Sequence, residues 1–478
     1  MFFRPTSKDY NEAYESGRLS PSEVIEKTLH AIRESDRARP SLGAFIELRD
    51  AAILDAAKES DERWRQGKAL SALDGVPVAI KDEFDVEGYR TRAGTTFLGQ
   101  RAASKDASVV ERLRRKGAII LGKTHMTEIG MGGVGVNPHF PAPRNPFDPF
   151  RMTGGSSSGS AAAVAAGLCP IALGSDAGGS IRMPASLCGI YGFKPTFGRL
   201  PTTGGALLAW SLDHAGPLGA SINDVAMFYD ATCGRDSSDR ASQLAPHARR
   251  IATLRIPKAK NLKVAWCPEF ADDADEEVRR AFHEALATLR EMGAKVEKVS
   301  LKYVELIQKV GYVTFVAEAA ASQADSLRKY REEYNLDTRL LLAVGERVSA
   351  AEYLHAQRVR SLIRDEFLGV FGEHDLFLNP TLACTARPIE RAAEKEGQVD
   401  TALNDAIARY TFCGTLTGFP ALSIPCGVDR AGLPIGLQIM ARPWADEAVL
   451  RYGAALDQLM PAMPKPKMNW DILGLEMD

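Results

Sequence analysis

The sequence predicts an α/β protein with a mixed, twisted β-sheet flanked by helices on both faces. Short apolar runs typical of buried strands, such as VPVAIK and AIILG, alternate with segments of helical periodicity. A chain of 478 residues with 45% hydrophobic side chains can bury a large core. No internal repeat, low-complexity tract or linker divides it, so we expect one large domain over residues 1–478.

The first part of the chain, residues 1–70, is predicted to be helical. Ser20 and Glu23 have the spacing of a capping box, and Pro21 suits the first position of the helix that follows. Apolar residues then recur at helical spacing. A second, charged helix is expected from Asp50 to Gln66.

Residues 71–220 are predicted to continue as alternating strands and helices. Within them, residues 137–151 contain five prolines, so this segment is expected to be a loop. In chain order, we expect a strand over 76–81, a helix over 108–117, a strand over 118–122, a small-residue helix over 160–166 and a strand over 171–174.

The remainder of the chain is predicted to add strands to the sheet and helices around it. Residues 302–372 are charged and helix-rich, and they could form a cap over a site. The other predicted elements are a strand over 262–269, an amphipathic helix over 275–293, and late strands over 375–381, 421–428 and 432–441.

Composition limits the function classes. The 59 basic and 61 acidic residues balance and form no basic block, which argues against a nucleic-acid-binding surface. The seven cysteines are scattered and lack a CxxC pair, as expected for reduced thiols rather than a metal site. The chain begins without an apolar leader and has no run of about 18 apolar residues, so we expect a cytoplasmic protein without a membrane partner.

Two motif matches suggest other functions, and the surrounding sequence argues against both. Residues 117–124 read GAIILGKT and fit the phosphate-loop pattern, but their variable positions are themselves the predicted strand. Residues 155–159 read GSSSG and fit the nucleophile elbow of an α/β-hydrolase esterase, with Ser157 as nucleophile. That motif needs a preceding strand and a late catalytic histidine, whereas a proline-rich loop precedes it and the last histidine is His374.

The densest functional signal is the Gly/Ser-rich region from Gly154 to Pro184. The segment GSDAGGS ends at Ser180, and its glycines can present several N–H groups toward one point, as an oxyanion hole requires. Ser156 is either a helix N-cap or a proton relay. Lys81 ends an apolar run and is either paired with Asp82 or Asp85 or kept neutral by burial. A neutral lysine could activate a serine without a histidine.

These residues resemble the amidase signature family. The resemblance rests on VPVAIKD, GAIILGKT, the block from GGSSSGS to GGSIRMP, CGIYGFKPTFGRLP, SLDHAGPL and GLPIGLQIM, which together span most of the chain. It implies the amidase signature fold, with residues 71–220 as its catalytic core. It also implies a serine amidohydrolase without a cofactor or metal, acting on a small-molecule amide.

The resemblance assigns roles to individual residues. It implies Ser180 as the acylated nucleophile, Ser156 as the bridging serine in a cis peptide and Lys81 as the base. The N–H groups of Ala177, Gly178, Gly179 and Ser180 would form the oxyanion hole. Ser158, Ala177 and Thr153 depart from the commoner residues of the family. Ala177 would donate through its backbone, so the oxyanion hole is expected to be kept, whereas Ser158 and Thr153 leave the pocket lining open.

Further residues are expected near the site. Asp176 and Arg182 flank the nucleophile and are interpreted as a structural ion pair. Met131, Gly132, Gly133 and Trp210 are candidates for substrate binding. Together with Phe140, Phe147, Phe150 and Leu207, the apolar ones among them suggest an apolar or aromatic substrate.

The family resemblance leaves the substrate open. The favoured reading is a stand-alone amidase for aliphatic or aryl amides, anilides, hydrazides or carbamates; a homodimer is compatible with it. One alternative is the glutaminase A subunit of a tRNA-dependent amidotransferase, although the segment from Gly122 to Pro146 departs from the sequence expected for it. A third class, a catalytically silent binding protein, is disfavoured because all three triad positions are filled.

Overall fold

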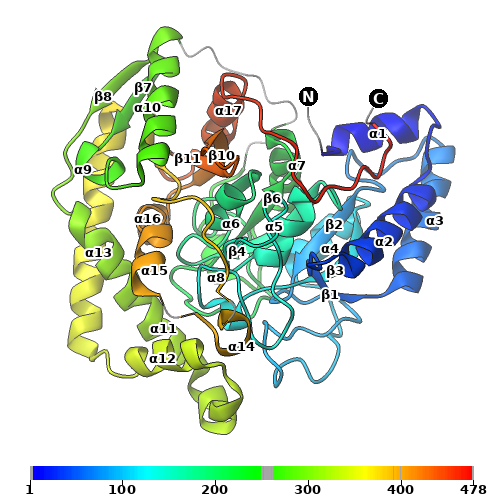
Figure 1. The fold of residues 1–478 in the computed structure, drawn as a ribbon, viewed down its shortest axis with the longest axis horizontal. Coiled ribbons are helices and arrows are strands. Elements are labelled where there is room, and N and C mark those ends of the chain that lie inside the picture. Colours follow the sequence, from blue (N-terminus) through cyan, green and yellow to red (C-terminus); the bar gives the residue numbers. More distant parts are fainter. Residues whose placement is uncertain are drawn as a thin grey trace.

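In a computed structural model, the chain forms an 11-stranded mixed sheet with helices on both faces (Figure 1). The structure describes residues 4–248, 251, 260, 262–390, 392–398 and 400–475. The strand order is β1-β3-β2-β4-β6-β5-β10-β11-β9-β7-β8. The predicted fold class is therefore confirmed.

The sheet combines parallel and antiparallel pairs. β2 lies parallel to both β3 and β4, and β7 lies parallel to β8 and β9, whereas the other neighbours are antiparallel. The strands are β1 (Phe45–Leu48), β2 (Pro77–Lys81), β3 (Ile119–Thr124), β4 (Ile171–Asp176), β5 (Tyr191–Lys194), β6 (His214–Gly219), β7 (Lys263–Trp266), β8 (Lys295–Lys298), β9 (Leu376–Pro380), β10 (Ala421–Val428) and β11 (Pro434–Met440).

The helices precede, connect and follow these strands. The α-helices are α1 (Ser7–Glu15), α2 (Pro21–Arg37), α3 (Asp50–Arg65), α4 (Ser108–Arg115), α5 (Ser158–Ala165), α6 (Arg182–Leu187), α7 (Ile222–Thr232), α8 (Arg240–Gln243), α9 (Pro268–Ala271), α10 (Glu276–Glu291), α11 (Ile307–Tyr330), α12 (Leu336–Gly345), α13 (Ala350–Glu373), α14 (Ala393–Glu396), α15 (Thr401–Ala408), α16 (Phe412–Thr417) and α17 (Asp446–Asp457). Short 3₁₀ turns are η1 (Glu128–Gly130), η2 (Val304–Leu306) and η3 (Arg331–Glu333).

Alternating side chains of the strands supply cores on both faces of the sheet. In β2, Val78 and Ile80 pack into the cluster that also contains side chains of α4, α7, α10 and α17. Ala79, between them, packs with side chains of α2, α3, α5 and α6 on the opposite face. Successive residues of a strand point to opposite faces, so a strand covered on both sides reads as a continuous apolar run.

Local signals placed several elements correctly. α2 begins at Pro21: the Ser20 side chain accepts from the Glu23 N–H at 3.3 Å, and the Ser20 N–H donates to the Glu23 carboxylate at 2.7 Å. This reciprocal pair satisfies two N–H groups that a helix start would leave unpaired. Residues 137–151 hold neither helix nor strand, as their prolines predicted.

The region 302–372 is helical, as predicted. It forms α11, α12 and α13, and α11 packs against both of the other two helices. Figure 1 shows α13 running along the β7–β9 end of the sheet, where Phe367 of α13 packs against Phe377 of β9, and α11 and α12 lie next to it. Among the described residues, no helix combines the length and apolar character needed to cross a bilayer.

Candidate active site

The site lies where two neighbouring parallel strands end. Ile80 of β2 pairs with Leu173 of β4, so Lys81 at the end of β2 lies beside the last residues of β4. Carboxyl ends of parallel strands meet at one edge of a sheet, and ligands commonly bind there. Ser156 reaches the same edge from the turn before α5, and Ser180 lies four residues after the end of β4.

Lys81 and Ser156 form a direct contact in the interior. The Lys81 Nζ lies 2.7 Å from Ser156 Oγ and 2.6 Å from Ser175 Oγ, and all three residues are buried. The peptide between Gly155 and Ser156 is cis, as the family resemblance implied. The amine is therefore shielded from solvent and in hydrogen-bond contact with the hydroxyl that it would have to deprotonate.

The charge environment of Lys81 contains opposing contributions. Burial lowers the pKa of Lys81, and the carboxylates of Glu83, Asp213 and Asp176 counteract this shift only in part. The carboxylate that contacts Lys81 is that of Glu83, with 3.5 Å between Nζ and Oε2. The expected partners Asp82 and Asp85 were wrong: Asp82 pairs with Lys123, and Asp85 accepts from the Thr91 hydroxyl.

Ser180 lines a partly apolar cavity. It is partly exposed, and its carbonyl accepts from the Ser157 N–H at 3.3 Å. The cavity has a volume of about 500 Å³ and extends from the glycines beside Ser180 to α11, α12 and α15. Its wall includes Gly130, Gly132, Gly133, Gly178, Met183, Tyr312, Val313, Phe315, Val316, Leu341, Val344, Val348, Ile407 and Phe412.

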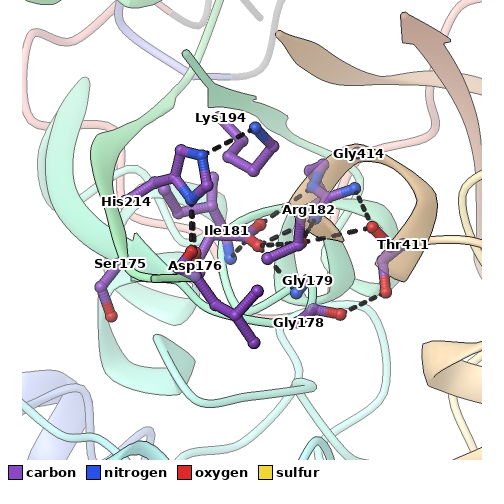
Figure 2. Close-up of polar contacts among 12 residues, drawn as sticks. Ser175, Asp176, Gly178, Gly179, Ile181, Arg182, Lys194, His214, Thr411 and Gly414 are labelled. Atoms are coloured by element: carbon purple, nitrogen blue, oxygen red, sulfur yellow. Dashed lines mark hydrogen bonds and ion pairs between the residues drawn. The ribbon is translucent and has the colours of Figure 1, made fainter. Parts of the chain in front are cut away.

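Asp176 and Arg182 form the predicted ion pair. Two nitrogens of the fully buried guanidinium donate to the two carboxylate oxygens at 2.8 and 2.9 Å, which is the bidentate geometry (Figure 2). Burial would raise the pKa of Asp176, but the Arg182 charge and hydrogen bonds outweigh it and lower this pKa to about 2. Arg182 also donates to the Thr411 carbonyl and to Gln438.

This ion pair holds the turn that carries Ser180, the expected nucleophile. The Gly179 N–H donates to Asp176 Oδ1 at 2.8 Å and the Ile181 N–H donates to Oδ2 at 3.3 Å, so the carboxylate is bound on both sides of Ser180. From the side of α16, the Thr411 hydroxyl donates to the Gly178 carbonyl (Figure 2). Of the four N–H groups expected in the oxyanion hole, that of Gly179 is thus already engaged by Asp176.

The family model described as Amidase matches residues 23–450. The chain belongs to the amidase signature family. This membership makes it an amide-hydrolysing enzyme.

Known relatives of this amidase differ in what they act on. It is 37% identical to a fatty acid amide hydrolase of Arabidopsis thaliana, over 98% of this chain and 78% of the relative. It is 36% identical to the A subunit of a glutamyl-tRNA(Gln) amidotransferase of Chloroflexus aggregans, over 94% of each. A solved bacterial aryl acylamidase of the family superposes with a TM-score of 0.85 at 26% identity, covering 96% of each chain. Sequence identity therefore does not separate the stand-alone amidase from the amidotransferase component.

The structure separates the four residues expected to bind substrate. Gly132 and Gly133 line the amidase cavity together with Ser180. Met131 is not in the wall; its side chain packs in a small core with Phe97, Ile129 and Leu208. Trp210 is 53% exposed and lines two other depressions, so its assignment to this cavity was wrong. An indole in a loop is as compatible with an exposed surface as with a pocket, and the sequence does not distinguish them.

The disfavoured motifs have structural explanations. Residues 119–124 of the phosphate-loop match form β3, and Lys123 is buried with its amine on the carbonyls of Asp82 and Arg90. Ser157 of the elbow match is buried at the start of α5, and its hydroxyl contacts the Ser175 carbonyl at 3.3 Å. His125 is buried against Ser158, and burial lowers its pKa to about 3.

Three polar residues of the site were not identified in the sequence. Ser175 contacts Lys81 directly, and Glu83 and Asp213 are buried carboxyl groups that act on its charge. Ser175 could have been found from the alternation of β4, one position before Asp176. Asp213 lies before β6, and only the sheet order brings that strand beside β4.

Proposed function

We propose that this protein is a serine amidase that cleaves the C–N bond of amides through an acyl-enzyme on Ser180. The observation that carries the proposal is the buried 2.7 Å contact between Lys81 and Ser156, at the edge of the sheet where the turn carrying Ser180 opens into a cavity. A histidine-free relay needs an amine that can be neutral near neutral pH, and burial lowers the pKa of Lys81 in that direction.

The proposed reaction proceeds in two steps. Neutral Lys81 takes the proton of Ser156, and Ser156 takes that of Ser180 as its oxygen forms a bond to the amide carbonyl. The N–H groups of Ala177, Gly178 and Ser180 stabilise the oxyanion. When the C–N bond breaks, Ser156 delivers a proton to the leaving amine, and Lys81 returns its proton to Ser156. Water then hydrolyses the ester on Ser180 by the same relay.

The cavity supports an amide with an apolar acyl group as the substrate class. Aliphatic and aromatic side chains of α11, α12 and α16 form most of its far wall, and its volume of about 500 Å³ accommodates more than an acetyl group. The similarity to a fatty acid amide hydrolase agrees with this choice. A glutaminase requires polar groups that recognise a charged amino acid, and the cavity is also lined by Glu305, Gln308, Lys309, Thr401, Asn404 and Asp405. Glutamine is therefore included in the substrate test below.

Replacing Ser180 by Ala tests the nucleophile. We expect the wild-type chain to form a covalent adduct with a fluorophosphonate probe and to hydrolyse a panel of primary amides and anilides with acyl groups of increasing length. Ser180→Ala should lose the adduct and at least about 1000-fold in kcat/KM, because the bond-forming oxygen is missing. The adduct is located by peptide mass spectrometry.

The matched control is Ser157→Ala in the neighbouring motif. This variant should keep both the adduct and amide hydrolysis, since Ser157 begins α5 and contacts a backbone carbonyl. An adduct that disappears in Ser157→Ala and persists in Ser180→Ala would favour the esterase alternative. Ammonia release from glutamine, exceeding hydrolysis of every apolar amide, would favour the amidotransferase alternative.

A further inference from the structure

One buried carboxyl group beside Lys81 has no role in the relay described above. Glu83 follows β2 by two residues, and its carboxylate Oε2 lies 3.5 Å from Lys81 Nζ. Its side chain is buried, and Oε1 has no hydrogen-bond partner among the described residues. A buried carboxylate oxygen without a partner is unfavourable for folding, so a chain that retains one at this place calls for a functional reason.

The position of Glu83 is fixed by its backbone rather than by its carboxylate. Its carbonyl accepts from the Ala206 N–H at 2.8 Å, and the next residue, Phe84, forms a bridge with Gly205. A methyl group built on Gly130 would lie 3.8 Å from Glu83 Oε2 and 3.6 Å from Ser156 Oγ. The Glu83 carboxylate and the Ser156 hydroxyl therefore approach the same glycine of the cavity wall.

The Lys81 amine has three polar neighbours at different distances. It lies 2.6 Å from Ser175 Oγ, 2.7 Å from Ser156 Oγ and 3.5 Å from Glu83 Oε2. An ammonium ion has three protons to donate, whereas the neutral amine has two and one lone pair. The protonated form can thus use all three neighbours, and the neutral form must turn its lone pair toward Ser156 to act as a base.

The other charged groups around Lys81 are engaged elsewhere. Asp176, on β4, is bound by Arg182, and Lys194 and His214 lie beyond it (Figure 2). Burial and the neighbouring Lys194 hold the pKa of His214 well below its usual value. Burial and the Arg182 charge lower the pKa of Lys194 to about 7. Asp213 accepts from the N–H groups of Leu208 and Ala209. Burial and the neighbouring Glu83 carboxylate raise the pKa of Asp213 to about 7. Glu83 is thus the carboxylate in contact with the amine.

We propose that Glu83 is a positioning residue for Lys81, which holds the amine against Ser156 and sets the pH above which that amine acts as a base. Its negative charge favours the protonated amine and opposes the effect of burial. Because of this charge, Lys81 can hold the proton that it takes from Ser156 until it returns that proton. The amine therefore alternates between its neutral and its charged form during the cycle. This inference rests on the proposed serine–lysine mechanism.

The test is the pH profile of kcat/KM for Glu83→Gln, with the best amide of the substrate panel. The amide side chain keeps the size of glutamate but removes its charge, so the ammonium form of Lys81 is less favoured. The acid limb, where Lys81 loses its proton, should move to lower pH by about one unit, the size expected for loss of an opposite charge within 4–6 Å. Glu83→Ala should move it in the same direction.

Two further variants separate charge from structure. Glu83→Asp keeps the charge one methylene farther from the amine, and its acid limb should stay nearer that of the wild type than that of Glu83→Gln. Glu87→Gln removes an exposed carboxylate from the same loop and should leave the profile unchanged.

The outcomes distinguish this inference from the proposed function. An unchanged acid limb in both Glu83→Gln and Glu83→Ala, with activity lowered equally at every pH, overturns the role of Glu83 while the amidase stands. A wild-type chain that forms no adduct on Ser180 and hydrolyses no amide overturns the proposed function itself. Melting temperatures within a few degrees of the wild type verify that the variants are folded.

Discussion

The surroundings of Lys81 act in opposite directions on its neutral and its charged form. Enclosure in the sheet disfavours its charge, and the carboxylates of Glu83, Asp213 and Asp176 favour it. The net effect is that the pKa of Lys81 is lower than that of a lysine in water, which is about 10.4. In the proposed mechanism, such an amine can act as a base toward Ser156 and can return the proton when the leaving amine needs it.

Replacing Lys81 by Ala should remove the base and leave the nucleophile in place. We expect kcat/KM at pH 7 to fall about 100- to 10,000-fold, the usual contribution of general acid–base catalysis. The acid limb of the wild-type profile should disappear, and the residual rate should rise with hydroxide concentration without a plateau. Stopped-flow acylation by an activated ester, measured from pH 6 to 10, provides this profile.

The control for this variant is Lys105→Ala, which removes an exposed lysine. It should reproduce the wild-type profile. If Lys81→Ala retained the wild-type limb with the same midpoint, the titrating group would be another residue, and the assignment of the base would be wrong.

At the residue scale, the sequence predicted the contacts that lie within motifs and missed those that depend on sheet order. Lys81, Ser156 and the Asp176–Arg182 pair each stand in a segment whose residue types suggest their chemistry. Glu83 was overlooked in favour of Asp82 and Asp85, because the direction of a side chain just after a strand end is set by the turn that follows. No sequence pattern specifies that turn.

At the scale of elements, local signals again predict some structure and miss what depends on tertiary packing. α2 was predicted from its capping box and proline, which are local signals, and it begins where they indicate. β6 was not predicted as a strand, because HAGPLG contains two glycines and a proline, residues that are depleted in strands. It is nevertheless a central strand, paired with β4 and β5. Tertiary packing there outweighs the local preference of the sequence.

α11 is the element that we expect to select the acyl group. Val313 and Phe315 of this helix face the cavity that contains Ser180. Val313→Trp should fill part of this space, so kcat/KM for an amide with a long acyl chain should fall at least about tenfold, as expected for a cavity that can no longer admit the group. The value for the acetyl amide of the same amine should change less than threefold. The ratio of the two constants is the measurement.

Ala324→Trp is the matched control for this element. Ala324 is exposed on the same helix and lies outside that cavity's wall, so the added indole should leave the ratio unchanged. Equal losses for both amides in Val313→Trp would mean that α11 was displaced as a whole and that the acyl group binds elsewhere.

At the scale of the molecule, Arg182 joins parts of the chain that are remote in sequence. It contacts Asp176 at the end of β4, the Thr411 carbonyl and Thr415 hydroxyl at α16, and Gln438 in β11. These contacts link the central strand that leads to Ser180 with the C-terminal part of the sheet. The single domain predicted from the absence of a linker thus has a polar connection at its centre, which the sequence did not indicate.

Replacing Arg182 by Met should therefore weaken the whole fold. Breaking a buried pair leaves Asp176 uncompensated, and the expected loss is roughly 3–5 kcal/mol in the free energy of unfolding by urea.

In the wild type, the lowered pKa of Asp176 means that its contribution is present above about pH 4 and is lost as the pH falls toward about 2. In Arg182→Met, burial instead raises this pKa, so the deficit should shrink from pH 8 to pH 5. Arg115→Met, which breaks an exposed pair with Glu111, should cost no more than about 1 kcal/mol. A deficit of that small size in Arg182→Met, equal at both pH values, would show that the connection contributes little to stability.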